Sequence, residues 1–307
     1  MATRRQPDYA PDVVRRTAAA GGLVRPQIAG RAIVVQIMLT DPGPFGNVPS
    51  FVEVLALPHA ERPARYRDAA WRARAEREIT QSWGDIVDRA RVSESVRHKE
   101  LVWGRTLGEL ARARGGTSAF ALMIDLALEE DLATRFHVPM TNDNEEQIGW
   151  MLNEDHLLLG LSDAGAHVAQ LCDANMPTEL LAYWVRDRKV FTLERAIQKL
   201  TSELAGFYGI ADRGRIAVGC AADLVVFDLA TLDPGPLRRV RDLPGDEERL
   251  VADRPKGIDW IFVNGVAITE NGRSRVADMH ERPGQMLRAG RRDASDGSPS
   301  AAGGAVA

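Results

Sequence analysis

The chain has 307 residues and a mass of 33.6 kDa, enough to bury a sizeable core in one large domain or two smaller ones. Its formal net charge of −4 argues against a nucleic-acid partner, which would need clustered excess Lys and Arg. No apolar run approaches the roughly 18 residues that span a bilayer, and the N-terminus lacks the apolar core of a signal peptide. Cys172 and Cys220 lie far apart and predict no disulfide, so we expect a cytoplasmic protein without a membrane partner.

The first 80 residues contain two helical patterns and one strand pattern. The helical patterns cover 11–20 and 60–79, and a β-branched run suited to a buried strand covers 32–39. The segment 41–49 is dense in Pro and Gly and is expected to be an irregular loop.

Between residues 98 and 153 the pattern alternates between strands and helices. Thr106 and Ser118 stand where helix N-caps are expected, and Asn142-Asp143 is expected to open a further helix. The predicted helices are 106–114, 119–131 and 144–153, and the predicted strands are 98–103 and 136–140. This alternation predicts an α/β fold with parallel strands.

The segment 157–168, LLLGLSDAGAHV, carries the strongest functional signal in the chain. An apolar run of strand length stops at Ser162-Asp163, and small residues and His167 follow. An acid at the carboxyl end of a buried strand is where a (β/α)₈ barrel places its chemistry. An Asp in a loop between a strand and a helix is also a common N-cap, so the residues alone leave both roles of Asp163 open.

The predicted secondary structure changes from helices to strands after about residue 213. Helices are predicted before that point, at 178–188, 192–200 and 201–207. The region 213–275 is predicted to be a small all-β unit, with a strand at 222–228 and a hairpin at 258–270 that turns at Asn264-Gly265. Residues 281–307 are rich in small and charged residues and predict a disordered tail.

Three stretches together resemble a known family. They are LGLSDAGAH at 159–167, LTSELAGFYGIADRGRIAVGCAADLVVFD at 200–228 and GIDWIFVNGVAITENG at 257–272. They resemble the C-terminal half of an amidohydrolase-superfamily enzyme, and most closely the N-acyl-D-amino-acid deacylase (D-aminoacylase) branch of the amidohydrolase 3 family. The resemblance is specific from about 140 to 270 and weaker from about 20 to 80.

The resemblance implies a fold and an activity. Residues 1–212 would form the C-terminal part of a metal-dependent (β/α)₈ (TIM) barrel with an insertion, and 213–280 the C-terminal strands of a composite β-sandwich. The reaction would be hydrolysis of a non-peptide C–N bond in a small N-acyl amino acid or a related amide. Zinc would activate the attacking water.

The same resemblance assigns roles to two residues. Asp163 would bind or face the metal and act as general base, taking a proton from water and passing it to the departing nitrogen. His167 lies four residues later and would orient Asp163 or contact substrate, and the alternative is a loop residue that shapes the floor of the pocket.

The chain departs from the family in its histidines. An intact member carries a His-x-His pair, a bridging ligand and two further His, whereas the six His here (59, 98, 137, 156, 167 and 280) form no such pair. Two interpretations therefore stay open. The chain is either a portion of a full enzyme or a catalytically inactive remnant or subunit, which would need an N-terminal partner chain or form a homo-oligomer.

Several other residues have ordinary structural interpretations. We expect His59, His98 and His137 to serve packing or the surface, and Asp223 to support the β-sandwich. His156 precedes the strand and would lie at the end opposite Asp163.

Overall fold

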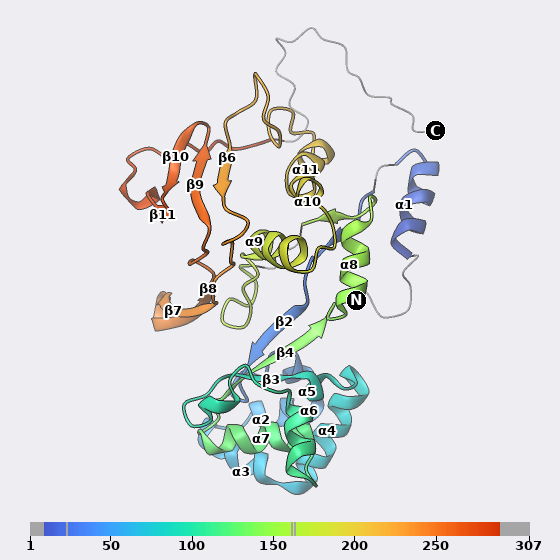
Figure 1. Ribbon diagram of the computed structural model, residues 1–307. Helices are drawn as coiled ribbons and strands as arrows, with labels where there is room; N and C mark the ends of the chain where they lie inside the picture. Colours follow the sequence, from blue (N-terminus) through green and yellow to red (C-terminus); the bar gives the residue numbers. More distant parts are fainter. Residues whose placement is uncertain (1–8, 23, 161, 163, 289–307) are drawn as a thin grey trace.

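The computed structural model describes residues 9–22, 24–160, 162 and 164–288. Asp163 and most of the predicted tail therefore lie outside the described residues. Two parts are evident in Figure 1: a helical unit with a small sheet, and a second part that holds a short parallel strand pair and the C-terminal strands. Strands β2 (Ile33–Ile37) and β4 (Arg135–Thr141) run between the two parts.

The parallel pair consists of two very short strands far apart in sequence. Strand β1 (Gln27–Ile28) pairs with β5 (Leu158–Leu159), with Ile28 opposite Leu159. The backbone N–H of Gly160 donates to the carbonyl of Ile28 at 3.2 Å, which continues the ladder past β5. Because the strands are parallel, the residues that follow each strand emerge at the same edge.

Helices surround this pair and bury its apolar side chains. They are α8 (Glu145–Asn153), α9 (Met176–Glu179), the π-helix Leu180–Asp187, α10 (Leu193–Leu200) and α11 (Ser202–Phe207). Helix α1 (Tyr9–Ala19) precedes β1 in the sequence and lies apart from them (Figure 1). These bounds confirm the helices predicted at 11–20, 144–153, 192–200 and 201–207. The predicted helix 178–188 is instead divided into α9 and the π-helix. Helix α8 is capped by Asn144, whose side chain accepts from the N–H of Gln147 at 3.0 Å, so the prediction that Asn142-Asp143 opens it was displaced by one residue.

The segment between β1 and β5 forms a three-stranded antiparallel sheet covered by helices. Strand β4 lies between β2 and β3 (Arg91–Glu94), with Val35 opposite Val138. The positions of β2 and β4 confirm the predicted strands 32–39 and 136–140, but the expectation of parallel strands was wrong for this sheet. Alternation of helices and strands along a sequence does not fix strand direction when the intervening helices lie at one end of the sheet.

The predicted strand 98–103 was also wrong. Residues Lys99–Leu101 form a 3₁₀ helix, and the strand of this region is β3, several residues earlier. The hydroxyl of Ser95 accepts a hydrogen bond from the N–H of His98 at 2.7 Å, which turns the chain away from an extended path.

Six helices complete the inserted unit, which we define as residues 33–141. They are α2 (Pro49–Leu55), α3 (Arg62–Arg67), α4 (Ala69–Trp83), α5 (Ile86–Arg89), α6 (Leu107–Arg114) and α7 (Ala119–Glu129). The helix predicted at 60–79 is divided at Asp68, whose extended backbone ends α3 and whose carboxylate accepts from the N–H of Trp71 at 2.6 Å. Thr106 and Ser118 are the N-caps of α6 and α7, as predicted.

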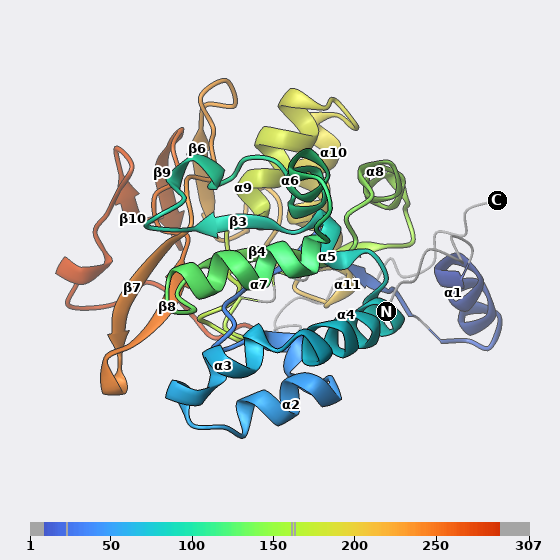
Figure 2. The same ribbon diagram turned by 90° about the horizontal axis from the view of Figure 1, so that it is seen from below.

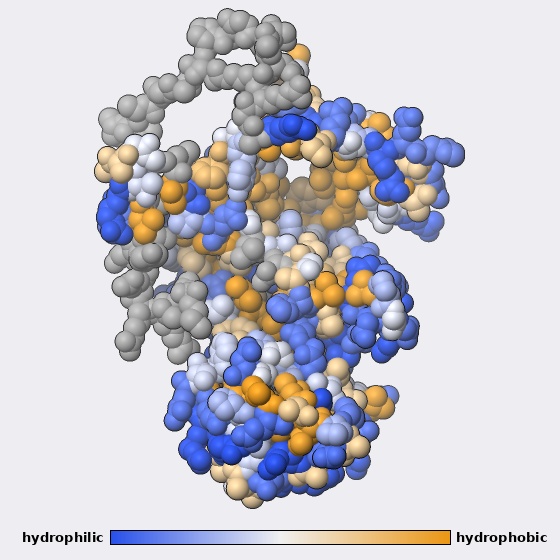
Figure 3. Space-filling model, turned by 180° about the vertical axis from the view of Figure 1, so that it is seen from behind, coloured by the Kyte–Doolittle hydropathy of each residue, from blue (hydrophilic) through white to orange (hydrophobic). Residues whose placement is uncertain are grey.

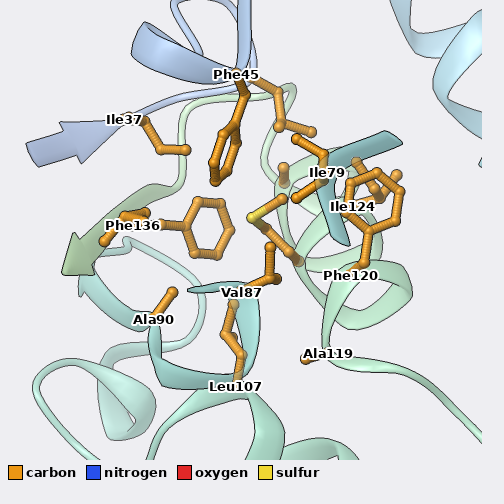
Figure 4. Close-up of a cluster of buried hydrophobic side chains, with 14 of the residues drawn as sticks. Ile37, Phe45, Ile79, Val87, Ala90, Leu107, Ala119, Phe120, Ile124 and Phe136 are labelled. Atoms are coloured by element: carbon orange, nitrogen blue, oxygen red, sulfur yellow. The ribbon is translucent and has the colours of Figure 1, made fainter. Parts of the chain in front are cut away.

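The core of the inserted unit joins its sheet to its helices. Figure 4 shows Ile37 and Phe136 from the sheet pointing toward Phe45, and Phe120 and Ile124 of α7 in the same cluster. Burial of this apolar surface is the main stabilising contribution here.

The C-terminal region is all β, as predicted. Strand β6 (Leu224–Phe227) lies at one edge of a sheet in the order β11-β10-β9-β6. The other strands of that sheet are β9 (Ile258–Val263), β10 (Val266–Glu270) and β11 (Arg273–Ser274). Asn264 and Gly265 have φ angles of 48° and 80°, as a type I′ hairpin turn requires. A separate hairpin pairs β7 (Arg238–Leu243) with β8 (Glu247–Val251).

Two expectations about the whole chain can also be compared with the structure. Cys172 is buried and Cys220 is partly exposed, and neither forms a disulfide in the structure. Among the described residues, no helix combines the length and apolarity needed to cross a bilayer.

Candidate functional site

The candidate site lies where β1 and β5 end. Strand β5 leads through Gly160 to Ser162-Asp163, and β1 leads through Ala29-Gly30 to Arg31, so both segments leave the same edge of the pair. Asp163 itself lies outside the described residues, so its role as base and metal ligand stays a prediction. His156 is exposed at the opposite end of β5.

Arg31 is the centre of a polar cluster at this edge. Its Nη1 lies 2.7 Å from Oδ1 of Asn175, 2.7 Å from Oε2 of Glu179 and 3.5 Å from Oδ1 of Asp173. The amide of Asn142 donates to the carbonyl of Arg31 at 2.7 Å and thereby ties the end of β4 to the end of β1. Burial raises the pKa of Glu179, an effect that Arg31 opposes and Asp173 reinforces. The cluster therefore fixes the segment 173–179 beside the strand ends.

The segment that follows Asp163, residues 164–172, lies between the inserted unit and the β7–β8 hairpin. The N–H of Gln36 on β2 donates to the carbonyl of Gln170 at 2.7 Å, and the N–H of Leu250 on β8 donates to the carbonyl of Val168 at 2.8 Å. The side chain of Gln170 is buried and donates to Oδ2 of Asp41 at 2.8 Å. A side chain on Gly43 would meet Gln170 at 3.0 Å, and the φ of Gly43 is +54°, so glycine suits this contact.

A cavity of about 470 Å³ opens between this segment and one face of the β7–β8 hairpin. Ala164 and Gly165, which directly follow Asp163 in sequence, are among its lining residues. Its apolar lining includes Val168, Leu171 and Val240, and its charged lining comes from two cross-strand pairs. These pairs are Arg238 with Asp253, and Arg249 with Asp242.

His167 is exposed and shapes a turn in the same segment. Its φ is 45°, and its carbonyl accepts hydrogen bonds from the N–H groups of Gln170 at 2.7 Å and Leu171 at 3.1 Å. Few residues other than glycine adopt positive φ, and His is among the more tolerant. Its predicted contact with Asp163 or substrate stays a prediction.

His137 is held in its neutral form by its surroundings. It lies on β4, and its ring meets the ring of Trp103 edge-on with centroids 4.9 Å apart. Burial, assisted by the charges of Arg31 and Arg91, lowers the pKa of His137 to about 4. This environment favours the packing role expected for His137.

We expect His137 to make folding stability depend on pH. The unfolded chain binds the proton with a pKa near 6.5 and the folded chain only near 4, so the contribution is complete above pH 6.5 and is lost as the pH falls toward 4. The loss is at most ~3 kcal/mol. Urea unfolding at pH 7 and pH 4.5 should therefore show a smaller difference for His137→Gln than for the unsubstituted chain. An equal difference in both proteins would contradict this assignment.

The described residues do not by themselves fit a zinc site. Within them, no three His, Cys, Asp or Glu side chains are grouped so that they could hold a metal ion. Zinc sites use at least three protein ligands, so a single carboxylate at Asp163 would need ligands from elsewhere.

The comparisons with known proteins identify the family. The model of the amidohydrolase family matches residues 62–251, which is more than half of the chain. The chain belongs to the amidohydrolase family. The matched range includes the segment 164–172 and the β7–β8 hairpin, so both lie within the part of the chain that matches the family.

The most similar relatives include two deacylases from Alcaligenes xylosoxydans xylosoxydans. N-acyl-D-glutamate deacylase is 38% identical over 122 residues, covering 38% of this chain and 20% of the relative. D-aminoacylase is 37% identical over 89 residues, covering 29% of this chain and 16% of the relative. The chain thus matches only a small part of each relative's length.

A solved structure gives a similar picture of partial coverage. The N-acyl-D-glutamate deacylase of Bordetella bronchiseptica, solved with zinc and a phosphonate inhibitor, is 22% identical. It matches over 91% of this chain and 45% of its own length, with a TM-score of 0.43. The chain therefore spans less than half the length of this structure.

Sequence analysis did not find the Arg31 cluster or the partners of Gln170. These residues come from segments more than 100 positions apart, and only the strand pairing brings them together. One available signal was the position of two polar residues at strand ends. Arg31 directly precedes the predicted strand 32–39, and Asn142 lies two positions after the predicted strand 136–140.

Proposed function

We propose that this chain supplies the Asp163-bearing part of a hydrolase that cleaves the non-peptide C–N bond of an N-acyl amino acid. The family match over 62–251 carries the proposal. It is supported by the parallel pairing of β1 with β5, because Asp163 follows β5 in sequence and a barrel carries its chemistry at the carboxyl ends of its parallel strands. In this assignment residues 1–212 belong to the barrel and its insertion, and 213–280 to the β-sandwich.

The proposed chemistry of Asp163 is proton transfer. A carboxylate close to the attacking water takes a proton as the C–O bond forms and gives it to the nitrogen as the C–N bond breaks. In the proposed enzyme, zinc would polarise the water and the amide carbonyl. Its remaining ligands would come from polypeptide beyond the described residues.

The cavity beside Ala164 and Gly165 suits an N-acyl amino acid. Such a substrate combines an apolar acyl group with a carboxylate, and the cavity combines an apolar lining with the guanidinium groups of Arg238 and Arg249. Each Arg gives two donors to its Asp partner and retains further N–H groups, because a guanidinium has five. We therefore place the substrate in this cavity.

The C-terminal sheet also supports a composite assembly. Strand β6 is an edge of its sheet, and Val225 and Val226 on it are both exposed, at 56% and 46%. Hydrophobic side chains gather in a recess in the upper half of the molecule in Figure 3. An exposed edge with apolar side chains is a template for pairing with further strands.

A second candidate is a catalytically inactive remnant or a non-catalytic subunit. The lack of a His-x-His pair in the sequence, together with the lack of a grouped ligand set among the described residues, favours it. Association with a partner through the β6 edge would then be its activity.

The native mass of the protein in its own cells separates these candidates. An antibody against 213–270 should detect either a band well above 33.6 kDa or a band at 33.6 kDa with a co-purifying chain that carries the missing ligands. Purified from those cells, that species should contain zinc and hydrolyse N-acyl-D-amino acids. A 33.6 kDa species with neither zinc nor hydrolysis would refute the proposed function. With a co-purifying partner it would be a non-catalytic subunit, and without one an inactive remnant.

A further inference from the structure

The β7–β8 hairpin has two different faces. In a strand, successive side chains point to opposite faces, so Arg238 and Val240 share one face and Arg239 and Arg241 the other. The first face lines the cavity. The second is directed to the inserted unit, and Figures 1 and 2 show the hairpin beside the end of the β2–β4–β3 sheet.

Arg239 joins three parts of the molecule at once. Its Nε donates to Oε1 of Glu94 on β3 at 2.7 Å, and its Nη2 donates to Oε1 of Gln36 on β2 at 2.7 Å. Its Nη1 donates to the carbonyl of Ala169 at 2.8 Å and to Oε1 of Glu248 on β8 at 3.2 Å. Four of the five N–H groups of the guanidinium are thus in use, and the side chain is only 13% exposed.

The hydrogen bond to Ala169 is one of three that consecutive backbone carbonyls of the segment accept. The carbonyl of Val168 accepts from the N–H of Leu250, that of Ala169 from Arg239, and that of Gln170 from the N–H of Gln36. The segment is therefore bound by the hairpin backbone, by a hairpin side chain and by β2 in turn. Of these three donors, the Arg239 side chain is the one that a substitution can remove.

We propose that Arg239 is a positioning residue, which holds the segment after Asp163 in register between the inserted unit and the hairpin. The proposal rests on the proposed function only in naming Asp163 as the group that is positioned. A lysine cannot replace Arg239, because one ammonium cannot reach the carbonyl of Ala169, Gln36 and Glu94 with the fork geometry of a guanidinium. Only four residues separate Val168 from Asp163 in sequence, so in the proposed function a loosened segment would act on catalysis through this short connection.

Hydrogen–deuterium exchange on the protein as isolated from its cells tests this inference. In Arg239→Gln and Arg239→Lys, amides of the 164–172 segment should exchange ~10- to 100-fold faster, as expected for loss of a hydrogen bond to a charged group. Exchange in α7 should be unchanged. Arg241→Lys is the matched control, because Arg241 lies two residues along the same face and is 59% exposed. It should leave exchange in the segment unchanged.

Kinetics provide the second readout. In the hydrolytically active species, Arg239→Lys should lower kcat ~10-fold or more with KM within ~2-fold, since the carboxylate is displaced and the cavity face of the hairpin is retained. Unchanged exchange of 164–172 in Arg239→Lys would overturn the inference, even if Arg239→Gln fails to fold. Faster exchange in a protein that hydrolyses nothing would support the positioning of the segment and refute the proposed function alone.

Discussion

Replacement of Asp163 by Asn is expected to reduce amide hydrolysis by the assembled enzyme ~10²- to 10⁴-fold, the range typical for loss of a general base. Asn has the same shape but cannot accept the proton from water at neutral pH. Initial rates with an N-acyl-D-amino acid, measured on the species purified from the native cells, would give the effect on kcat. Because Asn keeps the shape of the Asp side chain, KM should change little in enzyme that retains zinc.

Asp155→Asn is the matched control for this experiment. Asp155 precedes β5, and its carboxylate accepts a hydrogen bond from Arg195 at 2.7 Å. Its side chain is 82% exposed, so loss of this pair should cost at most ~1 kcal/mol of stability and leave kcat unchanged. Equal kcat values for Asp163→Asn and Asp155→Asn would remove Asp163 from the catalytic machinery.

Local signals in the sequence were sufficient where the determining contacts are local. Thr106 caps α6 through a reciprocal capping box with Glu109, and Ser118 caps α7, because both motifs are complete within four residues. The turn at Asn264-Gly265 depends on the tolerance of these two residues for positive φ. Such features need no knowledge of the rest of the fold.

The pairing of distant strands and the contacts between distant side chains could not be predicted from local signals. The sequence contains strands at 33–37 and 135–141, but their antiparallel pairing depends on how the inserted unit folds between β1 and β5. The two-residue strands β1 and β5 are defined by each other rather than by their own patterns. The polar contacts of Arg31 and Arg239 depend on pairings across 100 or more residues, so a single charged residue in the sequence gave no indication of them.

The inserted unit is joined to the candidate site by two strands and by a small number of polar side-chain and backbone contacts. Strands β2 and β4 carry the chain into and out of the unit, and Gln36 and Glu94 connect it to the segment after Asp163 and to Arg239. The buried side chains form two separate clusters. One comprises side chains of the inserted unit together with Leu171, and the other lies around β5, the π-helix and α10. Stability of the inserted unit should therefore be measurable separately from that of the strand pair.

Replacement of Trp71 by Ala should lower the stability of the inserted unit by ~3 to 5 kcal/mol, as for other large aromatic truncations. Trp71 is 2% exposed, and its ring meets Phe51 and Tyr66 edge-on with centroids 5.3 and 5.1 Å apart. Its Nε1 donates to the carbonyl of Ser50 at 2.9 Å, so the substitution also removes a buried hydrogen bond. Native-state hydrogen exchange should show faster opening of α4 and α7.

Trp150→Ala supplies the comparison at an exposed tryptophan outside both clusters. Trp150 lies on α8 and is 39% exposed, so its loss should cost ~1 kcal/mol or less. In Trp71→Ala, amides of α10 should exchange at nearly the original rate, because α10 packs in the second cluster. If α10 opened as fast as α7, the two clusters would form one cooperative unit, and the inserted unit could not move independently of the strands that lead to Asp163.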